Sequence, residues 1–274
     1  MEKDKLKILD GSFSHSILGY CSDYQVSNIF EWDRKITDLD NTVVITDSYL
    51  TQSNLPFNKK IAWLIEPKCI NINNYSFIYS NNKMFDYVLT HEKELLDKGE
   101  NFKFVPFGCC WIPEKEQKIY DKTNNISIIA SNKKQTDGHR LRHDVISKFK
   151  DNLDVYGNGY QKINSKLEGL KNYRFSIVIE NCSRDYWFTE KLIDCFMTGT
   201  IPIYWGCPSI GDFFDTDGML IFKSIDELDD IIKNCNEDLY MSKIKNIENN
   251  FNLGKNYLLP DNFVYNFIKN LNNE

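Results

Sequence analysis

Short apolar runs rich in β-branched and aromatic residues recur along this chain, and most are followed by a polar loop and a helical pattern. This alternation is typical of βα units, which build parallel sheets covered by helices. The runs in the first half are Leu6–Leu9, Val43–Ile45, Ile61–Ile65, Tyr87–Leu89 and Phe102–Val105. The runs in the second half are Ile126–Ala130, Leu153–Tyr156, Phe175–Ile179, Ile201–Tyr204 and Met219–Phe222. Because 274 residues suffice for two domains, the pattern predicts an α/β protein with two lobes.

One almost wholly polar stretch, residues 112–125, lies between the two sets of runs and is the best candidate for a linker. We therefore expect one lobe over residues 1–115 and a second lobe over residues 125–255. From Asp226 onward the apolar residues recur at helical spacing, and the end of the chain predicts one more helix. We expect this C-terminal helix within residues 256–274, where it could pack back on the first lobe.

The charge of the chain limits its partners. The sequence has 33 Lys and Arg against 39 Asp and Glu, a formal net charge of -6, so we expect no nucleic-acid partner.

The amino terminus has no apolar leader core, no run of about 18 apolar residues occurs, and the final residues are poor in lysine. The eight cysteines form no CxxC pair. We therefore expect a soluble cytoplasmic protein with no stable membrane anchor and with reduced, mostly buried thiols.

Ligands of open α/β sheets bind beyond the carboxyl ends of the strands. The run at 126–130 is followed by Ser131 and Asn132, by two lysines and by a helical stretch that carries Arg142. Polar side chains and a helix start favour negative charge, so this loop could hold a diphosphate. Taken alone, the same pattern is more often that of a plain capped helix start.

The densest group of polar residues, 180–191, directly follows the run at 175–179. Thr189 can cap the next helix, and Glu190 and Lys191 then lie in its first turn. A carboxylate and an ammonium at such a junction can hold ribose hydroxyls and a phosphate together. The alternative is an exposed ion pair, which is less favoured because a buried strand with a sharp Gly/Pro turn follows directly.

These segments together resemble a known family. The residues concerned are Tyr173-Arg174-Phe175, Glu180-Asn181, Phe188-Thr189-Glu190-Lys191, Gly199 to Gly206 and Pro208-Ser209-Ile210. They resemble the donor-binding motif of the α-1,3-fucosyltransferases of glycosyltransferase family 10, especially the bacterial ones. Ser131-Asn132 with Arg142 resembles an earlier segment of that family's donor lobe. The resemblance is specific over about residues 126–222 and thin before them.

The resemblance implies a GT-B fold, in which two Rossmann-like lobes have a cleft between them. Residues 1–115 would bind the acceptor, and residues 125–255 would bind the nucleotide-sugar donor. It also implies inverting transfer of L-fucose from GDP-fucose to a hydroxyl of a glycan, without a cofactor and without a catalytic metal.

The resemblance also carries roles over by position to single residues of the donor lobe. Arg142 and Lys191 would hold the diphosphate, and Glu190 would bind the ribose hydroxyls. Asn181 would lie beside the donor sugar.

Two positions depart from the family's pattern. Bacterial members often have a tyrosine two residues before Thr-Glu-Lys, where this chain has Trp187, so a phenol bond to ribose would have to come from Tyr186. The family's general base is the glutamate of a Glu-Ser-Pro turn, whereas here an aromatic strand ends in Glu66-Pro67 without the serine. Because an inverting transfer needs a carboxylate that takes the acceptor's hydroxyl proton, Glu66 is the candidate base.

Three other patterns suggest different chemistry, and we discount them. Asp215 and Asp217 resemble the Asp-x-Asp of metal-dependent glycosyltransferases, but the glycine beside them predicts a turn. His139 and His143 could share a helix face, yet basic residues lie between them, so we expect surface or phosphate-side histidines. Residues 157–159 lack the third glycine of a dinucleotide-binding loop.

Two alternative functions stay open at this point. The chain could be a transferase of the same fold that uses another nucleotide sugar. It could also be a nucleotide- or carbohydrate-binding module that retains the fold without turnover. The sequence specifies neither the acceptor glycan and its linkage nor the oligomeric state.

Overall fold

The computed structural model describes residues 3–11, 13, 16–22, 25–35, 42–52 and 54–271 of the chain. The chain divides into two compact units. Unit 1 comprises Met1–Phe107 and Leu259–Glu274, and unit 2 comprises Gly108–Leu258.

The polar stretch 112–125, expected as a linker, belongs to unit 2. Ile112 is completely buried there, and the side-chain amide of Gln117 donates to the Ile112 carbonyl at 2.9 Å. A short 3-10 turn, Glu114–Glu116, follows Pro113. In the structure this polar stretch is therefore part of unit 2.

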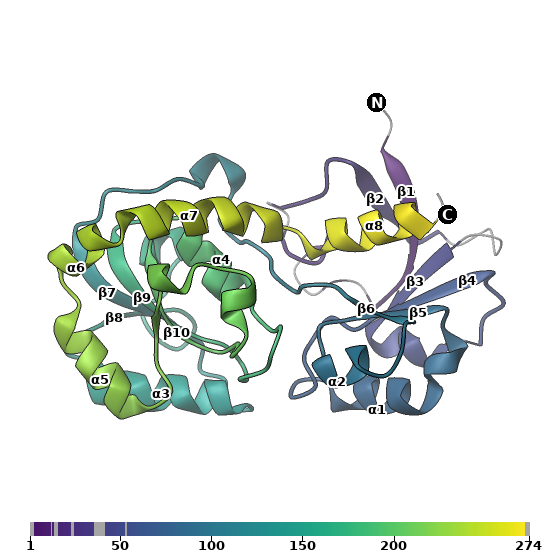
Figure 1. The fold of residues 1–274 in the computed structure, drawn as a ribbon, viewed down its shortest axis with the longest axis horizontal. Coiled ribbons are helices and arrows are strands. Elements are labelled where there is room, and N and C mark those ends of the chain that lie inside the picture. Colours follow the sequence, from purple (N-terminus) through teal and green to yellow (C-terminus); the bar gives the residue numbers. More distant parts are fainter. Residues whose placement is uncertain are drawn as a thin grey trace. The chain divides into compact units, whose positions relative to one another are not determined.

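Unit 1 contains a six-stranded parallel sheet in the order β2-β1-β3-β4-β5-β6 (Figure 1). Its strands are β1 (Asp4–Leu9), β2 (Phe30–Asp33), β3 (Thr42–Thr46), β4 (Lys59–Trp63), β5 (Tyr87–Thr90) and β6 (Phe102–Phe104). Its helices include α1 (Ile72–Asn81) and α2 (Lys93–Leu96). Val43, Val44 and Ile45 of β3 are all completely buried, as expected for a parallel strand covered on both faces.

Strand β2 is an element that the sequence pattern does not predict. Its four residues, Phe-Glu-Trp-Asp, include two acids, and Glu31 is exposed while Phe30 is 2% exposed. The strand lies at the edge of the sheet and pairs with β1. A short edge strand with charged side chains lacks the apolar run by which the other strands are recognised.

The last helix, α8 (Pro260–Leu271), is part of unit 1. Its Asp261 is 1% exposed and accepts a hydrogen bond of 2.6 Å from the indole nitrogen of Trp32. The ring of Tyr265 stacks on Phe30, with centroids 5.0 Å apart. These contacts join the end of the described chain to β2, near its beginning.

Unit 2 contains a five-stranded parallel sheet in the order β11-β10-β9-β7-β8 (Figure 1). Its strands are β7 (Asn124–Ile129), β8 (Asp154–Tyr156), β9 (Tyr173–Ile179), β10 (Ile201–Trp205) and β11 (Leu220–Ile221). Its helices are α3 (Asp137–Phe149), α4 (Glu190–Phe196), α5 (Ile225–Asn234), α6 (Glu237–Ser242) and α7 (Ile244–Gly254). Strand β8 lies on one side of β7, and the next strand in the chain, β9, lies on the other side of β7. The strand order therefore reverses beside β7.

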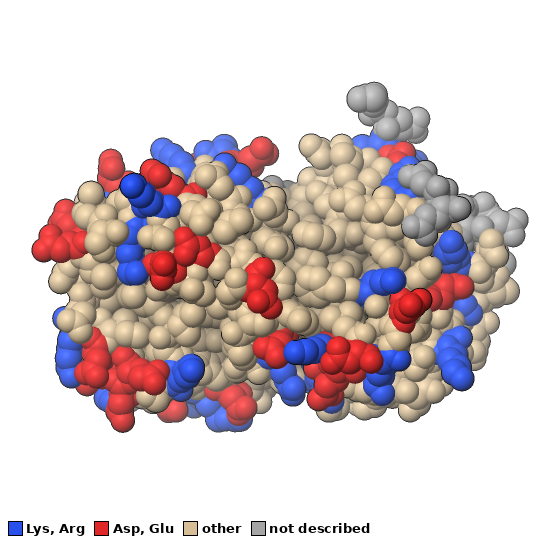
Figure 2. Space-filling model, viewed as in Figure 1, with Lys and Arg blue, Asp and Glu red and all other residues tan. Residues whose placement is uncertain are grey.

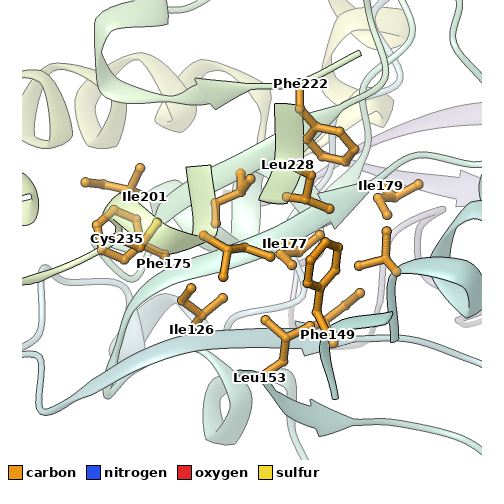
Figure 3. Close-up of a cluster of buried hydrophobic side chains, with 14 of the residues drawn as sticks. Ile126, Phe149, Leu153, Phe175, Ile177, Ile179, Ile201, Phe222, Leu228 and Cys235 are labelled. Carbon is orange, nitrogen blue, oxygen red and sulfur yellow. The ribbon is translucent and has the colours of Figure 1, made fainter. Parts of the chain in front are cut away.

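The central strand β9 explains how the sheet is covered. Phe175, Ile177 and Ile179 lie in one apolar cluster, together with side chains of α3 and α5 (Figure 3). Val178 lies in a second cluster, together with Leu192 of α4. Successive strand residues point to opposite faces, so this alternation places apolar side chains on both sides of the sheet.

The surface carries both signs of charge, and acidic and basic side chains are interspersed on the face seen in Figure 2. None of the helices in the described part of the chain combines the length and the apolar content that crossing a bilayer requires.

Candidate functional site

Unit 2 has a pocket of about 310 Å³ at the carboxyl ends of β7 and β9. This is the place where the strand order reverses, which is the usual ligand site of an open parallel sheet. The polar and charged residues that line the pocket come from two loops, one 3-10 turn and the helices α3 and α4, and include Ser131, Arg142, Asn158, Lys166, Glu190, Lys191 and Asp194. Residues far apart in the sequence therefore converge on one concave surface within a single unit.

Arg142 of α3 is a cation without an acidic partner at short range. The residue is 5% exposed, and its Nε and Nη2 donate to the carbonyl oxygen of Ile179 at 2.9 and 2.5 Å. Nη2 also donates to Oδ1 of Asn181 at 2.9 Å. Among the described residues, Arg142 forms no ion pair, and Nη1 makes no hydrogen bond. Burial lowers the pKa of Arg142, although the charges of Glu180 and Glu190 oppose this effect.

The start of α3 lies directly against the end of β9. The amide of Gly138 donates to the carbonyl oxygen of Asn181 at 3.1 Å, and a Cβ at residue 138 would lie only 1.7 Å from the carbonyl oxygen of Glu180. Thr136 caps the helix, because its side chain accepts from the amide of His139. This close approach places Arg142, one helical turn later, over the end of the strand.

We expect Gly138→Ala to destabilise the protein, because the added methyl group meets backbone that cannot rotate away. Overpacking of this kind typically costs about 1–3 kcal/mol. The check is urea denaturation beside Gly211→Ala, since a Cβ at Gly211 would meet nothing closer than 3.5 Å. The control should stay within about 0.5 kcal/mol of the parent protein. Equal midpoints for both variants would show that the α3–β9 contact can open without cost.

Glu190 and Lys191 begin α4 as the sequence predicts, with Thr189 as the N-cap. The ammonium of Lys191 donates to Thr189 Oγ1 at 2.9 Å and to Glu190 Oε1 at 3.1 Å. It also lies 3.5 Å from the completely buried carboxylate of Glu180. The charge of Lys191 is thus shared between two acids, unlike that of Arg142.

Lys166 and Asp194 line the pocket but are absent from the sequence-based candidates. Lys166 comes from the 3-10 turn Lys166–Gly169, and Asp194 is 1% exposed in the middle of α4. The Asp194 carboxylate accepts from the Lys166 ammonium at 3.1 Å and from the amide of Trp111 at 2.6 Å. One signal was present in the sequence: Asp194 is a single acid within the apolar run Leu192–Phe196, and a buried carboxylate needs a partner.

Ser131 and Asn132 follow β7 but lie differently. Ser131 lines the pocket, whereas Asn132 is exposed and packs beside Gly159. The loop 157–159, discounted as a dinucleotide fingerprint, does reach the pocket through Gly157 and Asn158. Gly157 has a φ of 113°, and a Cβ there would lie 2.1 Å from the carbonyl oxygen of Ala130, so a side chain is excluded.

The structure does not bring Tyr186 and Trp187 to the pocket wall. Trp187 is completely buried, and Tyr186 has a φ of 63° with its ring edge-on to Phe213. The amide of Tyr186 donates to Ser209 Oγ at 3.0 Å. These two aromatic residues therefore fix the loop between β9 and α4.

Glu66 lies in unit 1, just beyond the end of β4. Its side chain is half-buried, and its Oε1 accepts from the hydroxyl of Tyr20 at 3.2 Å. Its backbone carbonyl accepts from the hydroxyl of Tyr75 at 2.9 Å, and that hydroxyl lies 3.3 Å from Nε2 of His91. Burial lowers the pKa of His91 to about 3, so this imidazole is neutral at physiological pH.

Two discounted patterns also have defined structures. Asp215 caps a short 3-10 turn and accepts from the side-chain amides of Asn246 and Asn249, as a turn residue would. Of the two expected positions for His139, the surface is wrong, because the residue is 4% exposed and its Nδ1 accepts from the amide of Thr136; a position beside phosphate stays a prediction. Burial, with the neighbouring Arg142 charge, lowers its pKa to about 4.

Comparison with known proteins shows to which family the pocket-bearing part of the chain is similar. Residues 119–242 match the family model described as glycosyltransferase family 10 (fucosyltransferase), C-terminal part. Residues 119–242 therefore form a family 10 domain. The predicted resemblance of residues 173–210 to this family is confirmed. Trp111 also lines the pocket, and among the described residues it is the one lining residue outside the matched region.

Curated relatives of this family 10 domain match over short stretches. The α-(1,3)-fucosyltransferase FucT of Helicobacter pylori is 40% identical over 78 residues, which are 27% of this chain and 16% of that protein. A putative fucosyltransferase-like protein of Arabidopsis thaliana is 29% identical over 85 residues, 30% of this chain and 17% of its own. The matches thus span about one sixth of the length of these relatives.

Solved structures extend the likeness of fold to most of the chain. The crystal structure of an α1,3-fucosyltransferase with GDP-fucose has a TM-score of 0.60 at 17% identity and covers 93% of this chain and 90% of its own. The structure with GDP has a TM-score of 0.55 at 18% identity, covering 93% and 91%. The predicted fold class, GT-B with two Rossmann-like lobes, is confirmed.

Proposed function

We propose that this chain transfers L-fucose from GDP-fucose to a hydroxyl of a glycan, with inversion at the anomeric carbon. The observation that carries the proposal is Arg142, a buried guanidinium that lines the pocket without an ion-pair partner among the described residues. A buried cation in a concave site favours an anionic ligand, and a diphosphate supplies two adjacent charges. The family 10 domain and the structures holding GDP and GDP-fucose support this choice of ligand.

The pocket offers groups for the diphosphate, the ribose and the sugar of such a donor. Arg142 would bind the diphosphate through Nη1, and Lys191 would turn its ammonium from the neighbouring carboxylates toward the same phosphates. Glu190 would accept from the ribose hydroxyls, and Ser131 would donate to the phosphates. Asn181, whose Oδ1 is already held by Arg142, would lie beside the sugar.

The transfer itself requires a base and a leaving group. The acceptor hydroxyl oxygen attacks the anomeric carbon of fucose as its proton passes to the Glu66 carboxylate. The bond between that carbon and the diphosphate oxygen breaks, and GDP leaves with the electron pair. Arg142 and Lys191 stabilise the negative charge that develops on the diphosphate, which is the task of a divalent cation in metal-dependent transferases.

The test is incubation of the protein with GDP-fucose and a panel of glycans, with GDP release and glycosylated product measured together. We expect product with GDP-fucose, and the same rate with and without EDTA. Turnover only with another nucleotide sugar would replace the donor, and binding without turnover would identify a binding module. Activity that is abolished by EDTA and restored by manganese would contradict metal independence and draw attention to Asp215 and Asp217.

A further inference from the structure

The pocket contains a charge cluster of Lys166, Glu190 and Asp194, of which Lys166 and Asp194 have no part in the proposed roles. The ammonium of Lys166 lies between two carboxylates, 3.1 Å from Glu190 Oε1 and 3.1 Å from Asp194 Oδ2. It also lies 4.4 Å from the centroid of the Trp111 ring. The side chains of Glu190 and Asp194 are 16% and 1% exposed, and that of Lys166 is 19% exposed. Solvent therefore screens this cluster poorly, and each charge depends on its neighbours.

The two oxygens of Glu190 have different surroundings. Oε1 accepts from both Lys166 and Lys191, each at 3.1 Å. Within the part of the chain that the structure describes, the hydrogen bonds to the Glu190 carboxylate all go to Oε1 and none to Oε2. Since Glu190 lines the pocket, Oε2 is the oxygen that can accept from a ligand.

The charge of Glu190 depends on the two lysines. Burial works against ionisation of Glu190, but Lys166 and then Lys191 lower its pKa well below the usual range. Asp194 lies one helical turn further along the same face of α4, where its negative charge repels that of Glu190. Burial raises the pKa of Asp194, and Lys166 counters this rise. Without Lys166, two carboxylates would face each other with only the half-buried Lys191 beside them, and Glu190 would take up a proton or turn away.

Local backbone structure fixes the position of the Lys166 main chain. Ser165 caps the 3-10 turn in a capping box, in which the Glu168 carboxylate accepts from the amide of Ser165 at 3.1 Å. On the other side of the cluster, the amide of Trp111 donates to Asp194 Oδ1 at 2.6 Å. Lys166 is thus directed at Glu190 by contacts that do not themselves involve a ligand.

We propose that Lys166 is a positioning residue, which holds Oε1 of Glu190 so that Oε2 faces the pocket and accepts from the vicinal hydroxyls of a nucleotide's ribose. This inference rests on the proposed function, because it assumes a nucleotide in this pocket. It assigns to Lys166 selectivity for a ribose diol, a role separate from that of Arg142 toward phosphate.

The test compares the affinities of GDP and 2′,3′-dideoxy-GDP by calorimetry. The parent protein should bind GDP on the order of tenfold more tightly or better, because a hydrogen bond to a charged group contributes about that much. In Lys166→Met the ratio of the two affinities should fall to nearly one, while Lys166→Arg should retain most of the preference. Lys162→Met removes the same charge from an exposed position of the same segment and should leave the preference unchanged.

A double mutant separates positioning from general damage. If Lys166 acts through Glu190, then adding Lys166→Met to Glu190→Gln should change the preference no further. Should Lys166→Met alone fold poorly, Lys166→Met/Asp194→Asn removes both buried charges and should show the same lost preference. A full preference in Lys166→Met, or equal weakening of both ligands, would overturn the inference. If the parent protein binds neither ligand, the proposed function itself fails.

Discussion

Turnover of Glu66→Gln is expected to fall by about 10² to 10⁴ relative to the parent protein, because glutamine cannot take the acceptor's proton. Affinity for GDP should barely change, since the pocket that would hold GDP is formed by residues of unit 2. The measurement is the initial rate with saturating GDP-fucose, together with GDP affinity in the same buffer. The ascending limb of the pH profile, where a carboxyl loses its proton, should disappear in the variant.

Glu94→Gln is the matched control for this experiment. Glu94 is also a glutamate of unit 1, but its carboxylate is exposed and bonded to Lys68 and Tyr79. Its replacement should leave turnover within about twofold, as expected for a surface residue outside the chemistry. Near-normal turnover in Glu66→Gln would show that another group takes the proton. The missing serine of the Glu-Ser-Pro turn would then indicate that the base has moved.

Arg142→Ala is expected to weaken GDP binding by about 10- to 150-fold, the effect of losing a hydrogen bond to a charged group. Lys191→Ala should have a smaller effect, because the ammonium of Lys191 is already paired with Glu190 and lies near Glu180. Calorimetry with GDP and with guanosine separates the phosphate contribution. In Arg142→Ala the affinity for guanosine should stay close to that of the parent protein.

The neighbouring Arg140 provides the control on the same helix. Its guanidinium is exposed and bonded to Asp137, so Arg140→Ala should leave GDP affinity unchanged. Because Arg142 also binds the end of β9, the thermal midpoint of each variant must be recorded alongside. If GDP and guanosine weaken by the same factor in Arg142→Ala, the arginine supports the pocket wall and does not bind phosphate.

The strands were predictable where burial on both faces leaves a continuous apolar run. Ile126–Ala130 and Phe175–Ile179 are runs of this kind, and they appear as β7 and β9. Edge position removes this signal, which is why β2 was missed. The stretch 112–125 shows a different limit, because polar composition marks exposure to solvent and does not tell to which unit a segment belongs.

The candidate site was predictable in part. Arg142, Glu190 and Lys191 were identified from a local motif, and all three line the pocket. Lys166 lies 24 residues before Glu190 in a polar segment, so no spacing rule connects the two. Trp187 shows the limit of carrying roles over by position, because this residue of the motif is completely buried and does not line the pocket.

The position of α8 bears on the order in which the protein is completed during synthesis. Unit 2 is one continuous segment, Gly108–Leu258, and all of it has left the ribosome before α8 emerges. Until α8 emerges, unit 1 lacks this helix, and Trp32 lacks the Asp261 carboxylate to which its indole nitrogen donates. Domains usually mature in the order of synthesis. Here unit 2 is expected to reach its native state first, and unit 1 can complete its fold only after α8 has been synthesised.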